Sequence, residues 1–341
     1  MNILHVTTEG SQVVRKEGNL AVKRGEEVLL FPLEKIGGVV LHPGTSITEP
    51  ALRILLKKRA TVLHLGRNGR LVGISHSPDA RPDLSKLRAQ LGLRERPRQR
   101  VRLARQILWG KLSSQAAYLD LRARWAAKQR SAAPYFEEAA ERIRALRERL
   151  ASAEELRILR GLEGLASRLY FKALSEFLGS RDVVFPGRRF RPPKDVANAA
   201  LSYGYGILRA YVTTAVLQAK LLPRPGILHE DDLHNHATLV YDLMEEFRVP
   251  AVDMVVVKLL LNHQLSNRVA KQEHGAVFLN EEGRKRLSAA LVRRMQRVFV
   301  HPGLNKEGTL IEHIFEQAGR LGRAMVRDEH YIPFYLTEGG V

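Results

Sequence analysis

The periodicity of the apolar residues changes once along the chain, and this change divides it into two parts. The amino-terminal part consists of short apolar runs, such as Val28 to Phe31, which are separated by turn sequences such as Asn68-Gly69. From Pro82 onward the apolar residues recur instead at the three- and four-residue spacing of amphipathic helices. The sequence therefore predicts an α+β protein with a small amino-terminal β domain (1–74), a linker (75–81) and a larger all-α domain (82–341).

The β domain contains no motif with catalytic spacing. Its histidines His5, His42 and His64 are each isolated in or beside an apolar run, which favours structural histidines whose ring nitrogens are hydrogen-bonded. One helix, about Glu49 to Arg59 with Pro50 in its first turn, is expected to interrupt the strands.

The composition restricts the partners and the metal ligands. The 341 residues include 55 Lys and Arg against 36 Asp and Glu, a net charge of +19, which favours a polyanionic partner: DNA, RNA or an anionic membrane surface. No apolar run reaches the roughly 18–20 residues of a membrane span, and the amino terminus has no signal-peptide pattern. We therefore expect a cytoplasmic protein. Because cysteine is absent, metal ligands would be carboxylates and imidazoles.

Two stretches contain candidate metal ligands. Asp242 and Glu245 are three residues apart on a predicted amphipathic helix, and His229 precedes that helix. Glu163 lies within the apolar stripe of another predicted helix, where a buried carboxylate needs an Arg or a metal ion as a partner. Each residue alone also has an ordinary explanation. Glu163 could be ion-paired, Asp242 and Glu245 could lie on a solvated helix face, and His229 could be a capping or hydrogen-bonding residue.

Basic residues mark candidate contacts with nucleic acid. The irregular segment 179–194 carries three arginines around Phe190, namely Arg188, Arg189 and Arg191. Such a loop can contact phosphates and stack on an unpaired base, although a solvated loop has the same composition. Arg248, near the end of the acidic helix, is expected to neutralise a carboxylate or a phosphate. The tripeptide His234-Asn235-His236 does not indicate an HNH nuclease. In those enzymes the three signature residues are separated in the sequence.

Four longer motifs follow one another in the order seen in a known family. They are RGLEGLASRLYF (160–171), GRRFRPPKDVANAALSYGYGILRA (187–210), GILHEDD (226–232) and YDLMEEFRVPAVD (241–253). In this order the chain resembles the integrases of CRISPR adaptation, the Cas-one family. The resemblance extends to LHVTTEGS (4–11) and IGGVVLHPGTSIT (36–48), and thus covers essentially the whole chain.

The resemblance implies a metal-dependent reaction on double-stranded DNA. In that reaction the 3′-hydroxyl of a captured fragment attacks a phosphodiester at a CRISPR repeat border. Glu163, His229 and Glu245 would bind Mn²⁺ or Mg²⁺, and Asp242 would be a further ligand or would hold another ligand in place. These hard donors suit either ion, and Zn²⁺ also fits them.

The resemblance also implies partners and supporting residues. The family forms homodimers through its β domain, and a small protein of the Cas-two family bridges two dimers. Asn198 and Tyr203 lie within the second motif, which implies a supporting role near DNA.

The residues themselves leave two other functions open. The first is a non-catalytic basic DNA-binding protein, in which the acidic residues are only solvated or ion-paired. The second is a metal-dependent, structure-specific nuclease that cuts branched DNA and never joins a free 3′ end.

Overall fold

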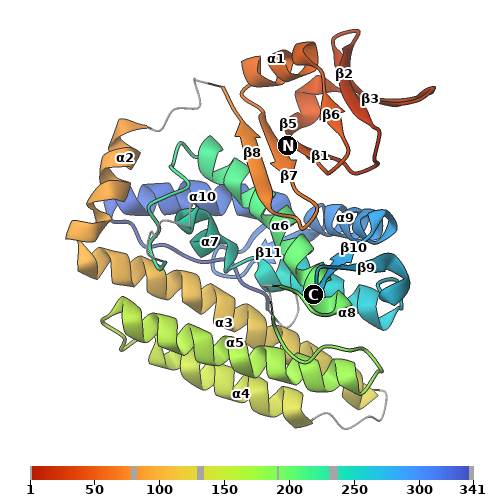
Figure 1. Ribbon diagram of the computed structural model, residues 1–341. Coiled ribbons are helices and arrows are strands. Elements are labelled where there is room, and N and C mark those ends of the chain that lie inside the picture. Colours follow the sequence, from red (N-terminus) through yellow and green to blue (C-terminus); the bar gives the residue numbers. More distant parts are fainter. Residues whose placement is uncertain (1, 78–82, 129–133, 190–191, 230–236, 338–341) are drawn as a thin grey trace.

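The computed structural model describes residues 2–77, 83–128, 134–189, 192–229 and 237–337 (Figure 1). A β-rich amino-terminal region is followed by a mainly helical carboxy-terminal region, which confirms the predicted fold class. The helical region also contains two short hairpins, β9–β10 (Ala270–Glu273, Ala276–Leu279) and β11–β12 (Val298–His301, Lys306–Thr309). The predicted linker, residues 75–81, lies mostly outside the described residues, and the domain boundaries stay a prediction.

The amino-terminal region contains two four-stranded sheets. The first sheet has the order β4-β3-β2-β6, with the strands Gln12–Lys16 (β2), Asn19–Arg24 (β3), Glu27–Phe31 (β4) and Ser46–Ile47 (β6). The second sheet has the order β1-β5-β7-β8, with the strands Asn2–Val6 (β1), Ile36–Leu41 (β5), Thr61–Leu65 (β7) and Leu71–Ser75 (β8). Helix α1 (Glu49–Lys57) interrupts the strands as predicted, with Pro50 in its first turn.

The second sheet is covered on both faces. Its strand β5 is buried along its whole length, which explains why its sequence is an uninterrupted apolar run rather than an alternating one. Val39 belongs to a small core that also contains Leu55 of α1, whereas the next residue, Val40, belongs to the core of the helical region. The two faces of this sheet thus connect the two regions of the chain.

Helix α6 (Val196–Gln218) is the central helix of the carboxy-terminal region. It is buried along almost its whole length, as expected for a helix that is apolar on every side. It contacts the second sheet, the helix α10 and the elements that follow residue 237. The turn between β7 and β8 lies directly on it, because a side chain at Gly206 would meet the carbonyl oxygen of Gly69 at 1.9 Å. A glycine is therefore required there.

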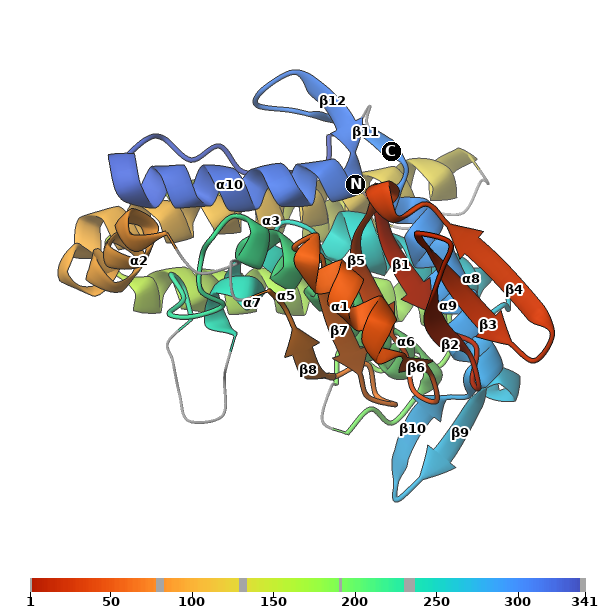
Figure 2. The same ribbon diagram turned by 90° about the horizontal axis from the view of Figure 1, so that it is seen from above.

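The other helices form the layers around α6. Three of them, α3 (Pro97–Lys128), α4 (Pro134–Arg149) and α5 (Leu156–Gly179), lie side by side on the face away from the β-rich region (Figure 1). The remaining helices are α2 (Leu84–Leu91), α7 (Thr238–Met244), α8 (Met254–Leu261), α9 (Glu281–Met295) and α10 (Leu310–Arg327). A π-helical turn, Arg248–Asp253, connects α7 with α8. Seen from above, β3 and β4 project from the edge of the molecule (Figure 2).

A chain of hydrogen bonds joins the second sheet to α6. Nδ1 of His5 lies 3.0 Å from Nε2 of His42, and Nε2 of His5 lies 3.0 Å from the hydroxyl of Tyr211. Nδ1 of His42 lies 2.6 Å from the hydroxyl of Tyr203. His5 and His42 are thus hydrogen-bonded structural residues, as predicted. Burial lowers the pKa of His5 to about 3 and also lowers the pKa of His42.

This histidine pair should make the stability of the protein depend on pH. The pKa of His5 is about 3 in the folded protein and 6.5 when unperturbed, so the unfolded chain binds the proton first as the pH falls. The contribution is present in full above pH 6.5 and is lost progressively toward pH 3. Thermal unfolding followed across this interval should show a weaker pH dependence for His5→Gln than for the wild type. An identical dependence would contradict this assignment.

Candidate metal centre

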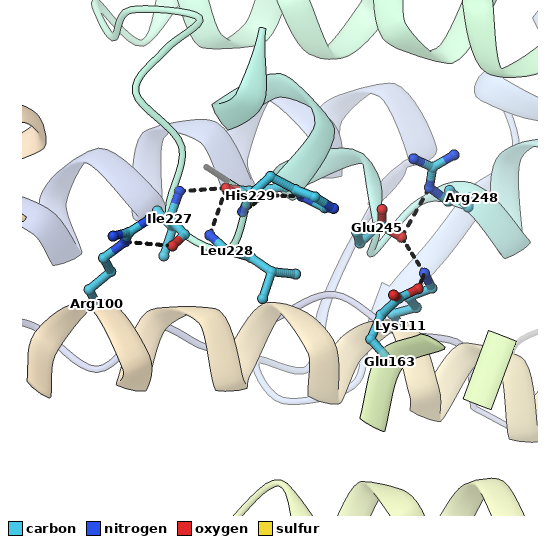
Figure 3. Close-up of polar contacts among 9 residues, drawn as sticks. Arg100, Lys111, Glu163, Ile227, Leu228, His229, Glu245 and Arg248 are labelled. Carbon is cyan, nitrogen blue, oxygen red and sulfur yellow. Dashed lines mark hydrogen bonds and ion pairs between the residues drawn. The ribbon is translucent and has the colours of Figure 1, made fainter. Parts of the chain in front are cut away.

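Four charged side chains from three parts of the chain meet at one point. Nζ of Lys111, on α3, contacts Oε1 of Glu163, on α5, and lies 2.6 Å from Oε2 of Glu245 (Figure 3). Glu245 directly follows α7, and its Oε2 also accepts a hydrogen bond of 3.0 Å from Nε of Arg248. The hydroxyl of Ser167 donates to Oε1 of Glu163 over 2.8 Å. Two carboxylates and two cations therefore balance one another's charge.

Local backbone structure explains why these groups converge. Glu163 lies one turn before Ser167 on α5, beside the buried residues Leu162 and Ala166 that pack this helix into the core. Helix α7 ends at Met244, and the π-helical turn that begins at Arg248 brings this arginine onto the carboxylate three residues before it. Bulges of this kind are frequent at functional sites.

The cations keep Glu245 ionised. Burial alone would raise the pKa of its carboxyl group, but Arg248, Lys111 and His229 outweigh burial and lower this pKa to about 2. Burial would likewise lower the pKa of Lys111, but Glu245 and Glu163 outweigh it and raise this pKa. The site therefore holds full charges that are largely shielded from water.

Asp242 fixes the segment that carries His229. Its carboxylate is fully buried and accepts hydrogen bonds from the backbone N–H groups of Ile227 (2.5 Å), Leu228 (3.0 Å) and His229 (3.1 Å). Oδ1 of Asp242 also lies 2.6 Å from Nδ1 of His229. Burial opposes protonation of His229, but the hydrogen bond and the charge of Asp242 raise its pKa. Both oxygens of Asp242 are thus engaged, and this residue positions the imidazole.

The predicted ligands lie in one region, but they do not form a closed metal site. Within the residues that the structure describes, no three His, Asp or Glu side chains lie close enough together to hold a metal ion. Nδ1 of His229 faces Asp242, and its ring points toward Glu245 (Figure 3). The ammonium group of Lys111 lies between Glu163 and Glu245.

The donor set nevertheless fits a hard divalent cation. Two carboxylates already share one buried cation, the Lys111 ammonium group. Because Asp242 engages Nδ1 of His229, Nε2 is the nitrogen left to bind a metal, and such carboxylate-histidine pairs are typical of metal sites. Carboxylate oxygens with one imidazole suit Mn²⁺ or Mg²⁺.

The charged cluster lies in a large open cleft. The cleft has a volume of about 1570 Å³, and Lys111, Glu163 and Glu245 are part of its lining. Its other lining residues include four arginines from the β7–β8 turn, the 187–189 loop and α6, namely Arg67, Arg70, Arg188 and Arg209. The guanidinium groups of Arg188 and Arg248 both lie over the ring of Tyr205, at 5.4 Å and 4.7 Å. The cleft therefore presents a basic surface around the two carboxylates.

The structure gives the other predicted residues different environments. Asn198 is buried, and its amide group bonds to Arg188, to the backbone N–H of Arg189 and to Asp195, so it holds the 187–189 loop in place. The hydroxyl of Tyr203 is engaged by His42 at the contact between the second sheet and α6. Arg189 is exposed. Arg191, Phe190 and the tripeptide 234–236 lie outside the described residues.

Two basic residues of α3 lie in this region, although the sequence did not place them at the site. Lys111 lies within a stretch of α3 in which nearly every residue is buried, and a lysine in such a position was a usable signal, because an unpaired buried ammonium group is costly. Arg100, also on α3, donates a hydrogen bond of 2.8 Å from Nε to the carbonyl oxygen of Ile227 (Figure 3). It helps to hold the segment that carries His229.

Comparisons with known proteins give one consistent result. The family model described as "CRISPR associated protein Cas1" matches residues 4–293. The chain is 39% identical to the CRISPR-associated endonuclease Cas1 1 of Thermus thermophilus, over 98% of this chain and 99% of that protein. It is 33% identical to the CRISPR-associated endonuclease Cas1 2 of Rhodospirillum rubrum, over 98% of each chain.

Solved structures share the fold. A casposase bound to its integration product matches with a TM-score of 0.83 at 22% identity, over 99% of this chain and 94% of that one. A Cas1 protein of Thermotoga maritima matches with a TM-score of 0.78 at 19% identity, over 96% of this chain and 97% of that one. The described helices include none that is long and apolar enough to cross a membrane.

Proposed function

The chain belongs to the Cas1 family of CRISPR-associated endonucleases, and on this premise we propose that it inserts captured DNA fragments into a CRISPR array. The 3′-hydroxyl of a fragment attacks a phosphodiester at the border of a repeat, and the 3′-oxygen of the cleaved strand leaves. One phosphodiester forms and one breaks, so the reaction needs neither water nor a covalent enzyme intermediate. The proposed location is the cytoplasm, where the array lies.

The observation that carries this proposal is the convergence of Glu163 and Glu245 on one cation within a basic cleft. Together with His229, these residues would hold Mn²⁺ or Mg²⁺. When bound, the ion supplies Lewis-acid chemistry: it offsets the charge of the phosphodiester and favours ionisation of the attacking hydroxyl. Asp242 orients His229 and Arg248 neutralises Glu245, whereas Arg188, in the lining of the cleft, would neutralise phosphate charge.

Several features support DNA as the substrate. The net charge of +19 and the arginines of the cleft suit a polyanion. The casposase that shares this fold is bound to an integration product, and a further Cas1 with a TM-score of 0.61 forms a complex with DNA. The proposed substrates are the double-stranded fragment and the repeat.

The chemical identity of the fragment end tests this proposal. A labelled duplex with 3′-hydroxyl ends, incubated with a supercoiled repeat-containing plasmid, Mn²⁺ and the Cas2 partner, should yield joined product. The same duplex with 3′-deoxy ends should yield none, because it lacks the nucleophile. Plasmid cutting that is equal with both duplexes, without joining, would favour the nuclease alternative. Metal-independent DNA binding without either reaction would favour the non-catalytic one.

We also propose a homodimer that forms through the β-rich region. Strand β4 is at the edge of its sheet, and its side chains Leu29 and Leu30 are 63% and 53% exposed. These two residues point to opposite faces of the strand. An exposed apolar edge strand favours association, and β4 projects from the molecule (Figure 2).

A charge on this strand should prevent dimer formation. We expect Leu29→Glu to elute with the mass of a monomer in light-scattering chromatography, whereas the wild type elutes as a dimer. Ile158→Glu, which places the same charge at an exposed apolar position of α5, is the matched control. A dimer that persists in Leu29→Glu would refute an interface at β4.

The assembly with a bridging partner is proposed on similar grounds. A Cas6-RT-Cas1–Cas2 complex contains a chain that matches this one with a TM-score of 0.79 at 26% identity, over 99% of this chain and 36% of that chain. Joining both ends of a fragment requires two catalytic centres at a fixed separation, which a dimer pair bridged by Cas2 provides.

A further inference from the structure

Lys111 is the least exposed cation of the charged cluster. Its side chain is 7% exposed, compared with 23% for Arg248. Its ammonium group contacts Oε1 of Glu163 and Oε2 of Glu245, the two carboxylates of the proposed metal site. It thus lies between these two side chains (Figure 3).

We propose that Lys111 is an internal counter-ion that competes with the divalent cation for Glu163 and Glu245, and so sets the affinity of the site for metal. This inference rests on the proposed function, since it assumes that these carboxylates are metal ligands. A carboxylate oxygen that accepts a hydrogen bond from the ammonium group must give up that contact, or share it, when it binds a metal ion. Metal binding therefore includes the cost of displacing Lys111.

The charges of the cluster support this competition. The positive charges of Lys111 and Arg248 balance the negative charges of Glu163 and Glu245. A divalent cation adds two positive charges at short range, and repulsion between cations is strong where water is largely excluded. The repulsion is relieved when the ammonium group of Lys111 moves away from the carboxylates.

The surrounding contacts indicate that Lys111, rather than Arg248, is the cation that moves. The guanidinium group of Arg248 lies 4.7 Å from the ring of Tyr205, which holds it in place, whereas Lys111 has a flexible four-carbon chain. Both carboxylates keep a partner after Lys111 has left. Ser167 still donates to Glu163, and Arg248 still donates to Glu245.

Replacing Lys111 by an apolar residue of similar length tests the inference through metal affinity. We expect Lys111→Met to bind Mn²⁺ at least about tenfold more tightly than the wild type in isothermal titration calorimetry. In EDTA its melting temperature should be lower, because two carboxylates lose a counter-ion, and Mn²⁺ should raise this temperature more than in the wild type. Damage to the fold would instead weaken metal binding, so the sign of the change is diagnostic.

Two further variants complete the test. Lys172→Met removes the same charge from an exposed position of α5 and should leave the affinity for Mn²⁺ unchanged. Lys111→Gln keeps hydrogen-bond donors but removes the charge, and it should also bind Mn²⁺ more tightly than the wild type. If Lys111→Met does not fold, the affinity of Lys111→Gln for Mn²⁺ tests the inference. Unchanged or weaker binding in a folded Lys111 variant would overturn the inference. A wild type that does not bind Mn²⁺ would instead overturn the proposed metal site.

Discussion

Glu245→Gln should reduce metal-dependent cutting and joining of DNA by at least about a hundredfold, since replacing even the outer partners of metal ligands costs about 10–100-fold. The substitution keeps the size of the side chain and removes its charge. Glu245 is buried, is ionised with a pKa of about 2, and contacts both Lys111 and Arg248. Without this negative charge, the site holds two cations against one carboxylate and repels a divalent ion.

The comparison requires a measure of folding and a matched control. Glu176→Gln makes the same change at an exposed position of α5, where the carboxylate lies 3.9 Å from Lys172, and should retain wild-type activity. Initial rates with Mn²⁺, together with thermal unfolding of both variants, separate loss of the site from loss of the fold. A folded Glu245→Gln protein with wild-type activity would exclude Glu245 as a ligand.

Asp242→Ala should lower the free energy of unfolding by about 3–5 kcal/mol, the range for breaking a buried ionic contact by removing one partner. Asp242 is fully buried and accepts hydrogen bonds from the consecutive backbone N–H groups of residues 227–229 as well as facing Nδ1 of His229. Alanine leaves these N–H groups without an acceptor. Metal-dependent activity should fall too, because His229 loses its orientation.

Urea unfolding is the direct measurement of this effect. Glu282→Ala serves as the control, because it removes an exposed carboxylate that pairs with Arg286 on α9. Such exposed pairs contribute roughly 0–1 kcal/mol. Equal unfolding free energies for the two variants would mean that Asp242 does not hold the segment of His229 as described.

Periodicity predicted the helices well because their signals are local. The helix expected at about Glu49 to Arg59 is α1 (Glu49–Lys57), and the helices of the carboxy-terminal region begin with α2 (Leu84–Leu91), close to the change of period at Pro82. The division of the amino-terminal strands into two sheets was not predicted. It depends on the parallel pairing of β1, β5 and β7 and on the contact of this sheet with α6, which are distant in sequence.

The candidate site was predicted only in part, because some of its contacts also join residues that are distant in sequence. Spacing and resemblance identified Glu163, His229, Asp242 and Glu245, which the structure places in one region. The apolar and small residues around Lys111 were a local signal that its ammonium group needs partners, but the identity of these partners depends on the packing of α3 against α5 and α7. Tyr203 belongs to a family motif, but its hydroxyl is engaged within the protein by His42. Neither contact is readable from local sequence.

Glu163, His229 and Glu245 are proposed to form a metal site for joining DNA. The most direct test of this proposal is strand transfer of a labelled duplex with 3′-hydroxyl ends into a supercoiled repeat-containing plasmid, with the Cas2 partner and either Mn²⁺ or EDTA, for the wild type and His229→Ala. We predict joining only by the wild type in Mn²⁺, while His229→Ala remains folded and dimeric. Joining that persists in EDTA, or in His229→Ala, would contradict the proposed site.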